Sequence, residues 1–93
     1  MSTPQERLHE ATRRLLDLLE AGEATTAETL AVREELARAT ADLGHLQDAW
    51  YQVDELRKDA LRTHGPDHPV VASARALQAD IEERAGGAVE DGA

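Results

Sequence analysis

Helix-breaking residues divide the chain at roughly even intervals and limit what it can fold into. Glycines, alone or paired with Pro or a second Gly, separate segments rich in Ala, Leu, Glu and Arg, which are good helix formers. No segment alternates polar and apolar residues with the period of two that a strand requires. We therefore predict an all-α chain without strands. The breakers are Gly22, Gly44, Gly65-Pro66 and Gly86-Gly87.

Capping signals place four helices in a single domain that covers about residues 1–85. Thr3-Pro4-Gln5-Glu6 has the form of a capping box, and Thr25-Thr26-Ala27-Glu28 repeats that signal. Asp67 or His68 is expected to cap the last helix. The predicted helices span about 4–21, 26–43, 46–63 and 68–85, and residues 86–93 are expected to form a flexible tail.

The apolar residues predict different degrees of burial for the helices. In the first helix, leucines spread over more than one stripe, so we expect a wide buried face or exposed leucine edges that favour self-association. The second and third helices carry apolar residues at regular helical spacing. In the last helix, one narrow stripe is formed by Val70, Ala74, Leu77 and Ile81, with Val71 outside it.

Composition argues against several classes of function. The chain has no cysteine, which removes disulfides, thiolate catalysis and cysteine-ligated metal sites. A net charge of −9 argues against nucleic-acid binding and favours a basic partner. No apolar stretch approaches the roughly 20 residues of a membrane span, and the N-terminus has no apolar leader. We therefore expect a cytoplasmic protein that does not bind membranes, and the abundance of Arg and Ala indicates a bacterial source.

Candidate catalytic and metal-binding clusters are weak. His64 and His68 have the four-residue spacing of helical metal ligands, but the intervening Gly-Pro should keep their side chains off a common face. Consecutive carboxylates such as Glu34-Glu35 point about 100° apart on a helix. We therefore predict no enzyme activity, no metal and no cofactor.

The chain repeats itself at an offset of 42 residues. Helix starts coincide at this offset, because Thr25-Thr26 falls on Asp67-His68. Such self-similarity is typical of stacked helical repeats. The identical pairs include Gly44 and Gly86, Ala37 and Ala79, Arg33 and Arg75, Leu19 and Leu61, and Asp17 and Asp59.

The central unit spaces small and apolar residues in a recognisable order, Leu36-Ala37, Gly44, Ala49, Val53 and Leu56, and a Gly-Pro-Asp-His-Pro connector follows at 65–69. Together these features resemble a tetratricopeptide repeat of the 42-residue, kinesin-light-chain type, over roughly residues 26–86. The resemblance implies four antiparallel helices arranged as two stacked hairpins, with small residues where helices approach closely. It also implies that one complete helix pair lies between a second helix and a first helix.

In that family the first helix of each pair lines a concave groove, and the resemblance carries this role to two helices here. Small residues beside mainly acidic ones suit a peptide carrying Arg or Lys. Tyr51 is a separate candidate, because its helical neighbours are polar and Tyr is favoured at interfaces, whereas Trp50 is expected in the core. The implied groove positions are Ala31, Glu34, Arg38, Ala41 and Asp42, with Ser73, Ala76, Asp80, Glu83 and Arg84. The candidate partner-binding residues are Glu34, Arg38, Asp42, Tyr51, Asp80 and Glu83.

We interpret the chain as a small non-catalytic protein–protein interaction module, an adaptor or regulatory subunit that binds a peptide or protein. Two alternatives stay open. The first is a structural homo-oligomeric bundle, such as a homodimer formed through leucines of the first helix. The second is a small ligand-binding or catalytic bundle that uses His64 and His68 on a metal.

Overall fold

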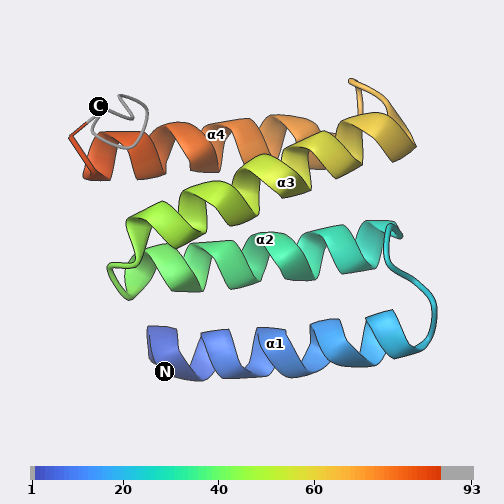
Figure 1. Cartoon of the computed structure of the whole chain (residues 1–93), viewed down its shortest axis with the longest axis horizontal. Coiled ribbons are helices and arrows are strands. Elements are labelled where there is room, and N and C mark those ends of the chain that lie inside the picture. Colours follow the sequence, from blue (N-terminus) through green and yellow to red (C-terminus); the bar gives the residue numbers. More distant parts are fainter. Residues whose placement is uncertain (1, 87–93) are drawn as a thin grey trace.

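The computed structural model describes residues 2–86, which form four α-helices and no strand. The helices are α1 (Pro4–Glu20), α2 (Ala27–Asp42), α3 (Leu46–His64) and α4 (Pro69–Arg84). Figure 1 shows them side by side in chain order, each running opposite to the one before it. The prediction of an all-α, four-helix fold is confirmed. Most of the predicted tail, residues 87–93, lies outside the described residues.

Each helix packs against its neighbour in the sequence, and α2 also contacts α4. Within residues 2–86, α1 contacts only α2. The helix starts repeat at the offset of 42 residues, because α3 begins 42 residues after α1 and α4 begins 42 residues after α2. The two hairpins, α1–α2 and α3–α4, are therefore built on the same register.

The first predicted cap is confirmed and the second is wrong by one residue. The Thr3 hydroxyl accepts from the Glu6 amide at 3.1 Å, and the Glu6 carboxylate accepts from the Thr3 amide at 2.8 Å. For α2 the N-cap is Thr26, whose hydroxyl accepts from the amide of Thr29. Because the helix starts one residue later than predicted, Glu28 is out of place for a capping box and instead forms an ion pair with α1.

The connector between α3 and α4 brings two histidine rings together. His68 caps α4, since its Nδ1 accepts from the amide of Val70 at 3.2 Å, as predicted. As predicted, Gly65-Pro66 ends α3 between His64 and His68, so the two residues do not share a helix face. The chain folds back there, however, and places their ring centroids 4.5 Å apart, which the sequence did not predict. His64 Nε2 donates to the carbonyl oxygen of Thr25 at 2.7 Å, which ties this connector to the one between α1 and α2.

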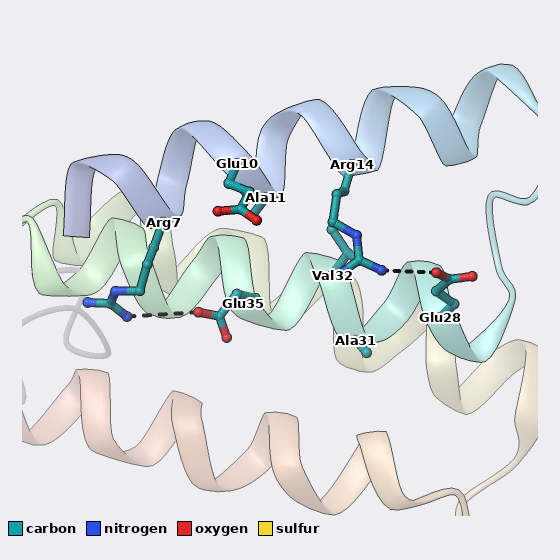
Figure 2. Close-up of a pocket in the computed structure, with 8 residues that line it drawn as sticks. All are labelled: Arg7, Glu10, Ala11, Arg14, Glu28, Ala31, Val32 and Glu35. Atoms are coloured by element: carbon teal, nitrogen blue, oxygen red, sulfur yellow. Dashed lines mark hydrogen bonds and ion pairs between the residues drawn. The ribbon is translucent and has the colours of Figure 1, made fainter. Parts of the chain in front are cut away.

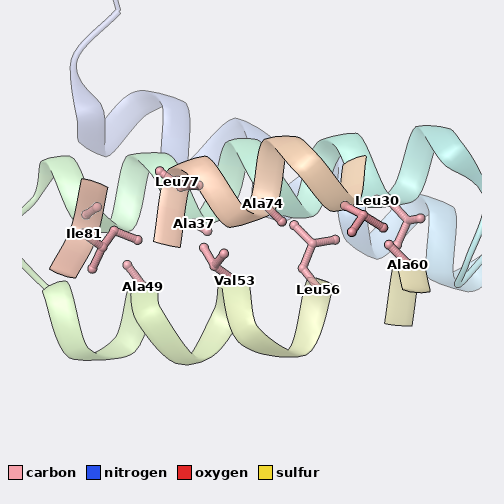
Figure 3. Close-up of a cluster of buried hydrophobic side chains, with 11 residues drawn as sticks. Leu30, Ala37, Ala49, Val53, Leu56, Ala60, Ala74, Leu77 and Ile81 are labelled. Atoms are coloured by element: carbon pink, nitrogen blue, oxygen red, sulfur yellow. The ribbon is translucent and has the colours of Figure 1, made fainter. Parts of the chain in front are cut away.

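The core lies between α2, α3 and α4 (Figure 3). Ala37 and Ala49 are both fully buried, so the inner helices meet through small side chains, as the sequence predicts. Trp50 packs at the edge of this core and its indole N–H donates to Glu82 of α4 at 2.9 Å. The larger buried apolar residues of the core are Leu30, Val53, Leu56, Val71, Leu77 and Ile81.

Helix α1 is less buried than the sequence predicts. Ala11 is the one residue of α1 that is buried, and Leu16 and Leu19 are 55 % and 46 % exposed. The expected wide buried face is wrong because a helix with one neighbour is covered on one side only. The predicted stripe of α4 also needs correction, since Val71 is buried and Val70 is only partly covered.

The tight contact between α2 and α3 gives a direct test of the packing. We expect Ala37→Leu to lower the free energy of unfolding by about 1–3 kcal/mol, because extra methyl groups do not fit a closely packed interface. Ala79→Leu is the matched control, since Ala79 occupies the equivalent position in α4 but is exposed. Its effect should stay within about 0.5 kcal/mol. Urea unfolding followed by the fluorescence of Trp50 measures both values, and equal losses would contradict the packing described here.

Candidate functional site

Five of the six predicted partner-binding residues lie on α2 and α4, on what we call the α2/α4 surface: Glu34, Arg38, Asp42, Asp80 and Glu83. Glu34 is the most enclosed of these, with its side chain 15 % exposed. Its carboxylate accepts from the Ser73 hydroxyl of α4 at 2.5 Å and from the Arg38 guanidinium at 2.8 Å. Glu34 therefore links the two helices as well as lining the surface.

Asp42 ties three helices together at the end of α2. Its carboxylate accepts from Arg7 of α1 at 2.8 Å and from Arg84 of α4 at 2.9 Å. Arg84 also forms an ion pair with Asp80 at 2.9 Å. The hydrogen bond from Arg7, followed by that from Arg84, holds the pKa of Asp42 below its ordinary value of 3.8. Asp42 is thus ionised and engaged within the protein.

The remaining residues of the α2/α4 surface face solvent. The side chains of Arg38 and Asp80 are about half exposed, at 44 % and 50 %, and Glu83 is also exposed. These three are free to contact a partner without loss of a contact between helices. Ala41, which the resemblance places in the groove, is buried in the core instead, so that expectation is wrong.

Tyr51 stands apart from the other five candidates. It lies on α3 and is 56 % exposed, which confirms the expectation that at least half of the ring is accessible. Val53, two residues further on, is fully buried. Because two residues correspond to about 200° of helical rotation, Tyr51 points away from the core. Its ring meets Trp50 edge to face, with the centroids 5.2 Å apart.

A cleft of about 400 Å³ between α1 and α2 was not predicted from the sequence (Figure 2). Two ion pairs cross it, Arg14 with Glu28 at 3.0 Å and Arg7 with Glu35 at 3.9 Å. Small apolar side chains lie between these charged pairs. The lining residues of this α1/α2 cleft are Arg7, Glu10, Ala11, Arg14, Glu28, Ala31, Val32 and Glu35.

The sequence contains a signal for this cleft in the repeat. At the offset of 42 residues, Arg14 corresponds to Leu56 and Glu35 corresponds to Leu77. Both leucines are buried where α3 and α4 form the core. Charged residues at the equivalent positions of α1 and α2 therefore mark a surface of the same shape that no helix of residues 2–86 covers.

The described part of the chain holds no cluster of metal ligands and no helix that could span a membrane. Among residues 2–86, no three or more His, Cys, Asp or Glu side chains gather closely enough to hold a metal ion. Nor does any helix there combine the length and apolar character needed to cross a membrane. His64 and His68 each hydrogen-bond to the backbone, which accounts for both rings structurally.

Comparisons with protein-family models, curated proteins and solved structures found no match to this chain. Its function is therefore inferred from its own residues. The two surfaces that those residues build are the α2/α4 surface and the α1/α2 cleft.

The three-helix contact of Asp42 predicts a specific pH dependence. Because the folded protein lowers the pKa of Asp42, its contribution to stability is present above about pH 4 and is lost as the pH falls through the folded value. We expect Asp42→Asn to reduce the free energy of unfolding by about 1 kcal/mol at neutral pH, with the difference from the wild type shrinking toward pH 3.

Urea unfolding at a series of pH values measures this difference. Asp17→Asn is a suitable control because Asp17 is exposed and has no ion-pair partner among residues 2–86. A destabilisation by Asp42→Asn that is as large at pH 3 as at pH 7 would show that the carboxylate charge is not its cause.

Proposed function

We propose that the chain is a small non-catalytic protein–protein interaction module with tetratricopeptide-like helical hairpins, acting in the bacterial cytoplasm as an adaptor or regulatory subunit. The observation that carries this proposal is the α2/α4 surface. Hydrogen bonds from Ser73 to Glu34 and from Arg84 to Asp42 hold two helices in a fixed relation. A rigid surface of this kind loses little entropy on binding, which favours recognition of an extended or helical peptide.

The charges of this surface define the partner that we propose. Asp80 and Glu83 are exposed carboxylates on α4, and the whole chain carries a net charge of −9. Arg38 supplies the one exposed positive charge on the α2 side of the surface. A peptide carrying Lys or Arg would place its charges beside α4 and would be repelled beside Arg38. Electrostatic complementarity of this kind selects the partner and its orientation.

Two charge reversals of opposite sign test this proposal. We expect Asp80→Lys to weaken binding of a basic partner roughly fivefold, since an exposed charge pair contributes about 1 kcal/mol. Arg38→Glu should strengthen the same binding, because it removes a repelling charge. Proteins are first captured on the wild-type chain from a lysate of the source cells, and the affinity of the purified partner for each variant is then measured by calorimetry.

The matched controls lie outside the surface. Glu55→Lys on α3 and Arg13→Glu on α1 change the net charge by the same amounts at exposed positions. We expect both control variants to bind as the wild type does. If Asp80→Lys and Glu55→Lys weaken binding equally, the effect comes from overall charge and the α2/α4 surface is not the binding site.

Tyr51 defines a second contact point, on the outer side of α3. An exposed Tyr contributes a large rigid area at low entropic cost, which is why it is common at interfaces. A partner that uses Tyr51 as well must contact α3 in addition to the α2/α4 surface. Tyr51→Ala should then weaken the binding of a whole protein partner but leave the binding of a short peptide on the α2/α4 surface unchanged. Calorimetry with both ligands separates these cases.

A structural homo-oligomer is the second candidate function, and one observation favours it. Leu16 and Leu19 are large apolar side chains that remain about half exposed on α1. Paired with the same residues of another copy, they would bury apolar area in a symmetric dimer. Leu16 and Leu19 lie one turn apart on the same face of α1, but exposed polar residues, Thr12, Arg13 and Glu20, border them. This surface is therefore small compared with the surfaces that hold obligate dimers together.

A further inference from the structure

The repeat shows which face of α4 lacks the neighbour that α2 has. On α2, residues Leu30, Ala37 and Ala41 belong to the core shared with α3 and α4, and Arg33 forms an ion pair with α3. At the offset of 42 residues, the equivalent residues on α4 are all exposed. This set, which we call the open face of α4, consists of Ala72, Arg75, Ala79 and Glu83.

The opposite end of the molecule offers the matching surface. On α3, Asp59 forms the ion pair with Arg33 of α2, and Ala49, Val53 and Leu56 belong to the core that α3 shares with α2 and α4. The equivalent residues on α1 line the α1/α2 cleft or follow it by one turn of the helix. This receiving set is Arg7, Ala11, Arg14 and Asp17. Figure 2 shows its first three members beside α2. Among residues 2–86, α2 is the only helix that contacts α1.

Both residues of one internal ion pair have an identical residue at the offset of 42, one on α4 and the other on α1. Arg33 of α2 and Asp59 of α3 form a largely shielded bridge at 2.8 Å. Their equivalents are Arg75 on the open face of α4 and Asp17 on α1, and both are exposed. Neither has an ion-pair partner among residues 2–86. The same bridge would form again if α4 of one copy met α1 of another.

A second pair of equivalent positions also carries opposite charges. Ala41 of α2 and Ala49 of α3 both lie in the core. At the offset of 42 residues, Ala41 corresponds to the acidic Glu83 on α4, and Ala49 corresponds to the basic Arg7 on α1. The bridge between Asp42 and Arg84 joins equivalent positions of α2 and α4, at 2.9 Å. In a continued stack, Arg84 of one copy would face Asp42 of the next, so opposite charges would alternate along the contact.

We infer that the occupant of the α1/α2 cleft is a second copy of this chain, which inserts the open face of its α4. The inserted helix would lie on α1 and α2 of the next copy as α2 lies on α3 and α4 within one chain. The contact joins two different surfaces, so it is heterologous and adds copies head to tail. Alanines and charges, rather than leucines, form the contact. The association is therefore weak and reversible, and it does not depend on whether the α2/α4 surface binds another protein.

Sedimentation equilibrium from micromolar to millimolar protein tests this inference on the full chain. We expect the average mass to rise continuously with concentration and to pass the mass of a dimer. Asp17→Arg and Arg75→Asp should each reduce the association constant roughly tenfold, because an attraction becomes a repulsion. The double variant should recover association, since the pair is then reversed but complementary. An equimolar mixture of the two single variants should also associate.

Two control variants keep the charges matched. Arg13→Asp and Glu55→Arg change exposed residues at equivalent positions, 42 residues apart. Glu55 stays exposed although α2 packs against α3, so its equivalent Arg13 should stay outside the proposed contact. Both should associate as the wild type does. Circular dichroism at 222 nm checks that all variants keep their helices, which we expect because the substituted residues are exposed.

Three results would overturn the inference. The first is a monomer at every concentration. The second is an average mass that levels off at that of a dimer and is unchanged by the charge reversals at Asp17 and Arg75. That result would indicate a dimer formed through the leucines of α1. The third is a double variant that associates no better than either single variant.

Discussion

The packing of α2 against α3 around the fully buried Ala37 and Ala49 is the contact on which the rest of the structure depends. The chain has one Trp, one Tyr and no Phe, so it lacks large side chains to bridge widely spaced helices. Buried alanines let the helix backbones come close enough for Leu30, Val53 and Leu56 to fill the remaining space. This core serves three helices and does not extend to α1. Helix α1 is therefore held by its packing against α2 and by ion pairs between these two helices.

Those polar links give several charged residues a structural role. Arg7 and Arg14 connect α1 to α2, and Glu34 and Asp42 connect α2 to α4. Exposed ion pairs contribute little each, so the α1 end should be the least stable part of the fold. A partner on the α2/α4 surface that displaced Glu34 or Asp42 from its internal contact would have to compensate for the bond lost. Binding through the exposed carboxylates Asp80 and Glu83 avoids that cost.

Local features were predicted well because neighbouring residues determine them. The box at Thr3 and the cap at His68 depend on residues within one turn, and helix boundaries fall within two residues of the predicted ones. Burial in α1 was not predicted, because leucine spacing does not reveal how many helices pack around it. The contact of His64 with Thr25 joins two connectors far apart in sequence, and only the fold brings them together. The α1/α2 cleft was missed for the same reason.

The charged residues of the cleft also keep the two proposed kinds of self-association on separate surfaces. Arg14 and Leu16 are two residues apart, so they point about 200° apart around α1. The cleft and the exposed leucines therefore occupy opposite sides of the same helix. Had Arg14 been a leucine like its equivalent Leu56, the cleft would present a continuous apolar surface of the kind that permanent interfaces bury. With charges at this position, a second helix can enter the cleft and leave again, while the leucine side of α1 stays accessible.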